Sequence, residues 1–169
     1  AALAVFDAEH VVNKTGDNPI AKLMGAYSSS ERIDNAIGQR SDGEGFVKAI
    51  EGAAHYSHVN LDDVKVIKTH GTGTKSNNEA EGNAIKKCFK EFVATSYKQK
   101  IGHTMGVSGL LESLMLFENM RSGYVPEIAN RTENDTIFLS NPVPNPNGYI
   151  MSLAAGMGNI YSAAIFDIR

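Results

Sequence analysis

The stretch Thr69-His70-Gly71-Thr72-Gly73-Thr74 decides the fold, because it places a histidine in a glycine-rich turn directly after a predicted strand. That strand is Val64–Lys68, a short run rich in β-branched residues, as is typical of buried strands. His70 is therefore expected at the carboxyl end of a strand, which is the edge where open α/β sheets keep their sites.

A second stretch, Lys98-Gln99-Lys100-Ile101-Gly102-His103-Thr104, places another histidine beside a glycine. It precedes residues 105–120, a strongly apolar helical pattern, so we expect His103 at or just outside a helix N-terminus. Two imidazoles held at such positions could both donate hydrogen bonds to one developing oxyanion. We therefore expect the rings of His70 and His103 to face a common cleft.

These stretches resemble the motifs of a known family. Residues 70–74, with Asn78 and Glu81 after them, resemble the first histidine motif of the β-ketoacyl-acyl carrier protein synthases, which are part of the thiolase-like superfamily. Lys98 and residues 102–109 resemble the lysine and the second histidine motif of that family, in the same order. Weaker matches occur at residues 42–45, 123–126 and 156–158. The resemblance spans nearly the whole chain and corresponds to the C-terminal half of the family's catalytic unit.

Predicted strands and helices alternate along the chain, which indicates an α/β fold. The resemblance implies a thiolase-like layered half, with a five-stranded mixed sheet packed between helices, formed by residues 1–169 as a single domain. Residues 1–7 contain an apolar run that predicts a buried strand, and the resemblance implies that this is the last strand of the preceding half. The other predicted strands are 20–27, 64–68, 92–97, 137–139, 149–154 and 161–167, and the predicted helices are 8–14, one that Asp42 would cap, 79–89 and 105–120.

The composition excludes several classes of protein. A chain of 169 residues with 42% hydrophobic and 21% charged residues can bury the core of one globular domain. A net charge of −3 with scattered lysines predicts no nucleic-acid partner and no binding to anionic lipid. No apolar run has the length of a membrane span and no signal peptide is recognisable, so a cytoplasmic location is expected. The single cysteine, Cys88, cannot form an internal disulfide, and no metal site is predicted.

His70, His103 and Lys98 are the candidate catalytic residues. For either histidine the alternative is an ordinary loop residue satisfied by backbone carbonyls, but their placement in two ordered motifs favours chemistry. Lys98 follows the predicted strand 92–97, and a lysine buried there needs a carboxylate partner. The resemblance implies Glu81 as that partner, so we predict a buried ion pair between Lys98 and Glu81.

Further residues have supporting roles that the resemblance implies. Glu112 interrupts an otherwise apolar helix, either as a tolerated, partly exposed acid or as a structural residue, and the resemblance implies a structural role near a bound monovalent cation. Thr72 and Thr74 would support the histidine loop. No catalytic cofactor is required by the implied chemistry.

A glycine turn near the end of the chain is the expected substrate gate. It comprises Gly156, Met157 and Gly158, where glycine would let the backbone pass close to a substrate. Residues 159–161 depart from the family's usual sequence after this turn. The residues therefore do not distinguish between fatty acid, polyketide and other acyl substrates.

The mechanism that the resemblance implies needs a nucleophilic cysteine, and no residue here matches its motif. In the family, an acyl group is carried on a cysteine of the N-terminal half. A malonyl thioester then decarboxylates to an enolate held by the two histidines, and the enolate carbon attacks the acyl thioester. The chain is therefore expected to be the C-terminal part of a 3-oxoacyl-acyl carrier protein synthase and to be inactive alone.

Several partners are expected for such a chain. They are acyl carrier protein or coenzyme A thioesters, the cysteine-bearing N-terminal half, and a second subunit in a homo- or heterodimer. The helix at 105–120 is apolar on more faces than one sheet can cover, so its second face is expected to be buried against another polypeptide.

Three alternative functions can be weighed on the residues. A phosphate-binding loop needs glycine directly before its lysine, whereas Thr74 precedes Lys75. A thiolase needs a second reactive cysteine in this half, whereas Cys88 falls on the predicted buried side of a helix. A non-catalytic subunit of the chain-length-factor type stays open, although such a subunit would have no need to keep both histidines, the lysine and the glutamate.

Overall fold

A five-stranded mixed sheet forms the centre of the computed structural model, which describes residues 4–32, 38–128 and 137–168. Its strand order is β1-β7-β6-β2-β3, and β7 runs antiparallel to both β1 and β6, whereas β6, β2 and β3 are parallel. The strands are β1 Lys22–Ser30, β2 Val64–Lys68, β3 Val93–Thr95, β6 Tyr149–Gly156 and β7 Ile160–Asp167. The predicted α/β fold with a five-stranded mixed sheet is confirmed.

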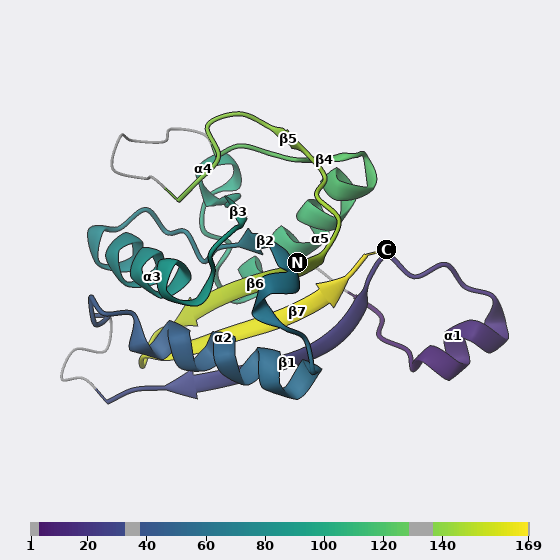
Figure 1. Cartoon of the computed structure of the whole chain (residues 1–169), viewed down its shortest axis with the longest axis horizontal. Helices are drawn as coiled ribbons and strands as arrows, with labels where there is room; N and C mark the ends of the chain where they lie inside the picture. Colours follow the sequence, from purple (N-terminus) through teal and green to yellow (C-terminus); the bar gives the residue numbers. More distant parts are fainter. Residues whose placement is uncertain (1–3, 33–37, 129–136, 169) are drawn as a thin grey trace.

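Helices cover both faces of the sheet, as Figure 1 shows. The helices α2 (Glu44–Ser57) and α3 (Lys75–Cys88) pack side by side on one face, and α5 (Ser108–Arg121) lies on the other. The smaller elements are α1 Glu9–Thr15, α4 Lys98–Ile101, the 3-10 turns Leu61–Asp63 and Met105–Val107, and the paired strands β4 Tyr124–Val125 and β5 Val143–Pro144.

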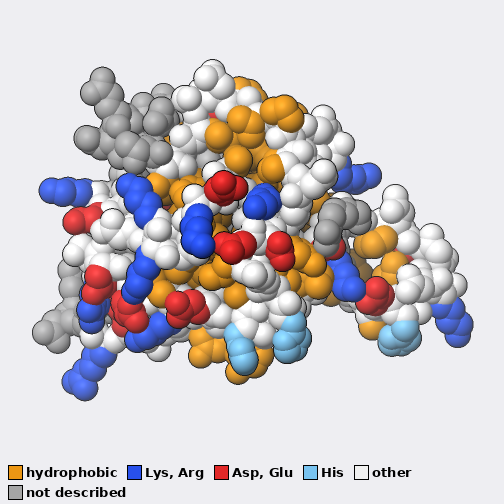
Figure 2. Space-filling view, in the orientation of Figure 1, with side chains coloured by type: hydrophobic (Ala, Val, Ile, Leu, Met, Phe, Trp, Pro, Cys, Tyr) orange, Lys and Arg blue, Asp and Glu red, His pale blue; other side chains and the backbone are white. Residues whose placement is uncertain are grey.

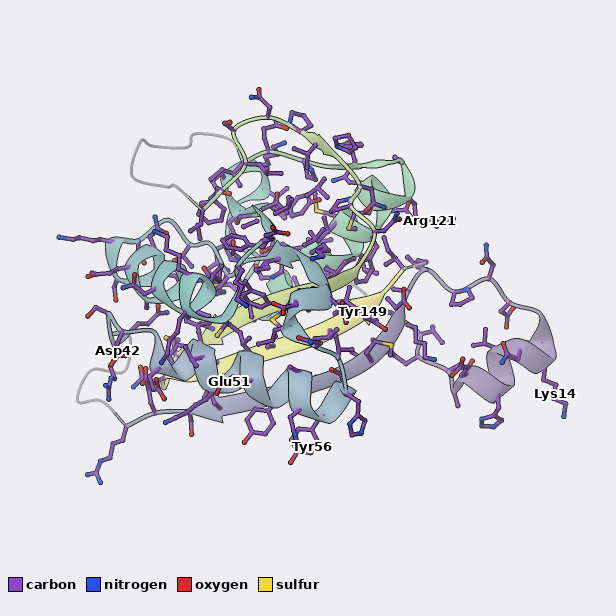
Figure 3. The ribbon with its side chains drawn as sticks, viewed as in Figure 1. Lys14, Asp42, Glu51, Tyr56, Arg121 and Tyr149 are labelled. Atoms are coloured by element: carbon purple, nitrogen blue, oxygen red, sulfur yellow. The ribbon has the colours of Figure 1, made fainter. Side chains whose placement is uncertain are left out.

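Each face of the sheet has its own hydrophobic core. The core beneath α2 and α3 includes Phe46, Ile50, Ile85, Met151 and Leu153, and the core beneath α5 includes Val66, Tyr97, Leu116, Phe117 and Ile150. Tyr56, near the end of α2, stacks on Tyr27 of β1 at the outer edge of the sheet, with ring centroids 5.6 Å apart (Figure 3).

The strand β2 positions the candidate site, because it lies between β6 and β3 and is hydrogen-bonded on both sides. The backbone N–H of Thr69 donates to the carbonyl of Thr95 at 3.0 Å, so the pairing with β3 continues one residue beyond β2. The loops after β2 and β3 therefore leave the same edge of the sheet together.

Some sequence predictions about local structure are wrong. Of the run at 1–7, residues 4–7 form no strand within the described chain, and Val5 and Phe6 are 85% and 69% exposed. That this run is the last strand of a preceding half stays a prediction. Of the predicted strand 137–139, only Phe138 forms a bridge, to Ala94. The helix expected at 79–89 begins earlier, at Lys75, because Thr74 caps it.

The cap predicted for α2 is shifted by one residue. Gly43 occupies the N-cap position with a left-handed φ of 67°, which glycine adopts without strain. Asp42, marked in Figure 3 beside the start of α2, still accepts a hydrogen bond from the N–H of Glu44 at 3.1 Å. The carboxylate therefore stabilises the first turn from outside the helix.

The helix α5 buries one face and leaves another half-exposed. Leu116, Phe117 and Met120 are buried in the core, whereas Leu110 and Leu111 are only partly covered by the described chain. The expectation that this second face packs against another polypeptide stays a prediction.

The visible surface over α2 and α3 carries lysines, arginines and acids of both signs side by side (Figure 2). This mixture agrees with the small net charge of −3. Among the described residues, no helix is long and apolar enough to cross a membrane.

Gly45 of α2 is required for close packing on β7. A Cβ at this position would lie 2.3 Å from the Tyr161 ring, which is 1% exposed and is held by a 2.6 Å hydrogen bond from its hydroxyl to Glu31. Gly45→Ala should therefore lower the free energy of unfolding by about 1 to 3 kcal/mol, although alanine has a higher helix propensity than glycine. Gly82→Ala in α3 is the control, because nothing lies within 4 Å of its Cβ, and it should be neutral or stabilising. Denaturant titration of both variants measures the difference, and equal midpoints would contradict the packing argument.

Candidate active site

The loop after β2 holds His70 in a buried position. Gly71 follows with a left-handed φ of 57°, and a Cβ there would meet Ser96 Oγ at 2.2 Å, so glycine is needed where this loop passes the end of β3. Thr74 accepts a hydrogen bond from the N–H of Asn77 at 3.3 Å and starts α3, and Thr72 bonds to the Thr74 hydroxyl at 3.2 Å. The two threonine hydroxyls thus join the loop to the first turn of α3.

Glu81 of α3 is fully buried, but it does not pair with Lys98 through a salt bridge. Its carboxylate accepts the backbone N–H of His70 at 2.5 Å, the N–H of Gly71 at 3.0 Å and the side-chain amide of Asn77 at 3.0 Å. Burial raises its pKa, and the three donors oppose that shift. The predicted Lys98–Glu81 pair is wrong: this carboxylate is aimed at the backbone of the histidine loop.

Lys98 instead pairs with Glu112, a completely buried residue of α5. Lys98 Nζ lies 2.7 Å from Glu112 Oε1, and the Lys98 side chain is only 4% exposed. The same carboxylate oxygen accepts the hydroxyl of Ser108 at 2.8 Å. Lys98 is therefore buried and ion-paired, as predicted, but with a different acid, because the turn after β3 faces α5 rather than α3.

A second lysine, Lys68, reaches the same carboxylate and was missed by sequence reasoning. Its Nζ lies 3.5 Å from Glu112 Oε2 and donates to the carbonyl of Leu153 at 2.9 Å, and the side chain is 1% exposed. Burial lowers its pKa to about 8, with Glu112 acting in the opposite direction. The period of two along β2 places Lys68 on the same face as the buried Val66, and this pattern could have indicated its burial.

His103 lies exposed at the turn before α5, and its contacts select a tautomer. The backbone N–H of Met105 donates to His103 Nδ1 at 3.0 Å, so Nδ1 must be an acceptor and the ring proton sits on Nε2. Met105 has a φ of 57°, a strained value for a non-glycine residue that this turn maintains. Ser108 Oγ lies 3.4 Å from the same Nδ1 while its proton points to Glu112. His103 is thereby held with Nε2 as its donor.

The two imidazoles meet at one edge of the sheet. The ring centroids of His70 and His103 are 5.8 Å apart and the planes are nearly perpendicular at 81°. The expectation that the rings approach one another is confirmed. Burial, and then the positive charges of Lys98 and Lys68, lower the pKa of His70 to about 3, so this ring is neutral at physiological pH.

The predicted gate residues lie at the end of β6 and in the turn that follows it, before β7. Lys68 pairs with Ser152 in the parallel register, so β6 continues beyond β2 and carries Gly156 past the edge where His70 lies. Met157 is 75% exposed, and Gly158 has a φ of 83°. Their role as a gate stays a prediction.

The surroundings of Glu112 do not fit the monovalent cation that the resemblance implies. Both carboxylate oxygens already face ammonium groups, those of Lys98 and Lys68, and Lys68 also uses the nearby Leu153 carbonyl. A further cation would be repelled by two buried positive charges. Elsewhere in the described ranges, no group of three or more His, Cys, Asp or Glu could hold a metal ion.

Cys88 lies at the end of α3, partly buried against the core, and burial raises the pKa of its thiol to about 11. A thiol in this state supplies little thiolate for nucleophilic attack. The thiolase alternative therefore has no support from this residue.

Residues 20–132 match the family model described as the C-terminal domain of β-ketoacyl synthases. The chain belongs to the β-ketoacyl synthase family. This match covers β1 through α5, and therefore both histidines and the two lysines that share Glu112.

Relatives of this ketoacyl synthase chain come from fatty acid and polyketide enzymes. It is 26% identical over 174 residues to the tetracenomycin polyketide synthase ketoacyl synthase alpha subunit of Streptomyces glaucescens, covering 98% of this chain and 41% of the relative. It is also 26% identical over 172 residues to 3-oxoacyl-[acyl-carrier-protein] synthase 2 of Mycobacterium leprae, again covering 98% and 41%. The chain therefore spans about two fifths of the length of these curated relatives.

Solved ketosynthases share the fold. The AntDE:AntF complex, a type II polyketide acyl-carrier protein with its ketosynthase bound to the hexaketide, matches with a TM-score of 0.87 and 22% identity over 96% of this chain and 42% of that chain. A β-ketoacyl synthase from Burkholderia phymatum matches with a TM-score of 0.82 and 24% identity over 95% and 40%. The thiolase-like ketosynthase architecture is thus confirmed.

The pair between Lys98 and Glu112 can be tested by Lys98→Met. Removing the ammonium leaves a carboxylate in the interior without its shortest charge contact, so the free energy of unfolding should fall by about 3 to 5 kcal/mol. Lys100→Met is the matched control, since Lys100 faces Glu127 at 3.5 Å on the surface and should change stability by less than about 1 kcal/mol. Denaturant midpoints of the two variants check this, and an unchanged midpoint for Lys98→Met would show that its charge is not buried.

The neutral state of His70 makes stability depend on pH. Between about pH 3 and 6.5 the unfolded chain binds a proton at this residue that the folded chain does not. The free energy of unfolding is therefore unaffected by this residue above pH 6.5 and falls as the pH is lowered below 6.5. At pH 5 the loss should be on the order of 2 kcal/mol. His70→Gln should therefore lose less stability than the parent between pH 7 and 5, measured by urea unfolding. His55→Gln, at an exposed position on α2, should keep the parental slope, and a parental slope in His70→Gln would refute the argument.

Proposed function

We propose that this chain supplies the enolate-stabilising half of a 3-oxoacyl-acyl carrier protein synthase. The observation that carries the proposal is the 5.8 Å approach of the His70 and His103 rings at the carboxyl edge of the sheet. The reaction would be the decarboxylative Claisen condensation of a malonyl thioester with an acyl thioester. The acyl group would be held on a cysteine outside these 169 residues, because the sole cysteine here, Cys88, has the raised pKa of a buried thiol.

The two imidazoles suit this reaction as hydrogen-bond donors held at one edge of the sheet. A malonyl thioester whose carbonyl oxygen lies between the rings would accept one N–H from each, with His103 donating from Nε2 because Met105 occupies Nδ1. As the bond between the methylene carbon and the carboxylate breaks, carbon dioxide leaves and the electron pair moves into the enolate, whose negative oxygen is stabilised by both donors. The enolate carbon then forms the new bond to the acyl carbonyl carbon, and the cysteine thiolate leaves.

Lys98 would act mainly through Glu112 and Ser108 in this arrangement. Its ammonium holds Glu112 Oε1, which also accepts the Ser108 hydroxyl, and Ser108 lies against His103 Nδ1. The positive charges of Lys98 and Lys68 also help to keep His70 neutral. Lys98 thus stabilises the positions of the two imidazoles, and neither ring has to accept a proton for decarboxylation to occur.

The proposed partners follow from the same reaction and from the relatives. An acyl carrier protein is the proposed carrier of the malonyl group, in line with the carrier protein that is bound to the AntDE:AntF ketosynthase. Coenzyme A thioesters are the alternative source of the same group. A cysteine-bearing half and a homo- or heterodimer would complete the unit, with the half-exposed face of α5 as a contact surface.

A non-catalytic subunit of the chain-length-factor type is the second candidate. One solved relative in fold is the ishigamide ketosynthase/chain length factor, with a TM-score of 0.85 and 19% identity. The ordered donor pair and its two supporting carboxylates favour the catalytic proposal, because a subunit that only shapes a pocket needs none of these contacts.

The proposal can be tested by the decarboxylation of radiolabelled malonyl-acyl carrier protein in the intact protein. Loss of one oxyanion donor should reduce the rate about 10²- to 10³-fold, so His70→Ala and His103→Ala should each have this effect. His55→Ala and His58→Ala at the end of α2 are matched controls and should keep the parental rate. If His70→Ala and His103→Ala release carbon dioxide at the parental rate while remaining folded, the two rings are not oxyanion donors.

A further inference from the structure

We propose that Lys68 is a built-in counter-cation that takes the place of a bound monovalent cation beside Glu112. Lys68 ends β2, two residues before His70, and its side chain is 1% exposed. The ammonium group lies between the carbonyl oxygen of Leu153 on β6 at 2.9 Å and Glu112 Oε2 on α5 at 3.5 Å. Carbonyl and carboxylate oxygens are also what a hard metal cation would bind.

The charges of the buried site balance only when Lys68 is counted. Two fully buried carboxylates, Glu81 and Glu112, lie close to the histidine loop, and both Lys98 and Lys68 are buried with them. With both lysines charged and both acids ionised, the formal charges sum to zero. Without Lys68 the set would carry one negative charge, which is costly in the interior and would attract a cation from solution.

The geometry at Glu112 shows why Lys98 alone does not suffice. Oε1 is saturated by the Lys98 ammonium at 2.7 Å and the Ser108 hydroxyl at 2.8 Å. Oε2 accepts no hydrogen bond from the described residues, and its nearest positive charge is Lys68. Lys68 therefore neutralises the oxygen that Lys98 does not reach, and it does so with a charge fixed to the sheet.

The dependence of stability on the cation can be measured without any condensation activity. The intact protein is unfolded by urea in potassium, sodium or tetramethylammonium chloride at one ionic strength. The parent should have the same midpoint in all three salts. A parental midpoint that rises in potassium or sodium relative to tetramethylammonium would overturn the proposal.

Variants at Lys68 should create the dependence that the parent lacks. Lys68→Ala opens space beside Glu112, so its midpoint should be lower and should rise with potassium or sodium concentration, as ligand binding to the folded state requires, but not with tetramethylammonium. Lys68→Met fills that space, so its midpoint should be lower in every salt and should not rise. Lys65→Ala, on the same strand but only half-buried, is the matched control and should be insensitive to the salt. A Lys68→Ala variant as insensitive as the parent would overturn the proposal.

A double-mutant cycle gives a second measurement if Lys68→Ala does not fold. Lys68→Met, Glu112→Gln and the double variant are compared by their unfolding midpoints in one salt. A charge contact predicts that Glu112→Gln costs less in the Lys68→Met background than in the parent. Additive effects would mean that Lys68 acts through packing alone and would also overturn the proposal.

Discussion

The buried carboxylate of Glu112 is the interaction on which the arrangement of the site depends. It joins three separate elements: Lys98 after β3, Lys68 at the end of β2, and Ser108 in its own helix α5. A charge in the interior is stable only when its partners are correctly placed, so this carboxylate fixes all three elements relative to one another. His103 gains its position from the same set, because Ser108 and the strained turn at Met105 both face its Nδ1.

A second carboxylate performs the corresponding task from the opposite layer of the fold. Glu81 projects from α3 and binds the backbone N–H groups of His70 and Gly71, whereas Glu112 projects from α5 on the other face of the sheet. The two histidine loops are therefore each held by an acid from a different helix layer. This explains how two rings on separate loops reach a centroid distance of 5.8 Å without a direct bond between them. It also explains why the site requires the complete layered domain rather than either loop alone.

The electrostatics of the site keep His70 a neutral hydrogen-bond donor. Burial and two neighbouring ammonium groups keep the pKa of His70 near 3, so this ring donates an N–H without carrying a charge. A fixed neutral donor suits an enolate oxygen, because the charge appears only in the transition state and the donor need not reorganise. The thiolase-like fold is shared with ketosynthases at identities of 22% and 24%. The contact of a second lysine, Lys68, with Glu112 is an observation on this chain.

Local patterns in the sequence determined the strands β1, β2, β3, β6 and β7 and the helices α1, α2, α3 and α5, as well as the carboxyl-edge position of His70 and the position of His103 before a helix. These features depend on periodicity and turn residues, which act over a few neighbouring positions. Tertiary structure alone decided which acid pairs with Lys98. Glu81 and Glu112 both lie on helices beside the site, but α3 and α5 pack on opposite faces of the sheet, and Lys98 reaches only the acid on α5. It also decided that Lys68 is a buried cation and that Val5 and Phe6 are exposed. The physical reason is the same in each case: burial and ion pairing depend on which elements meet across the sheet, and spacing along the chain does not specify that.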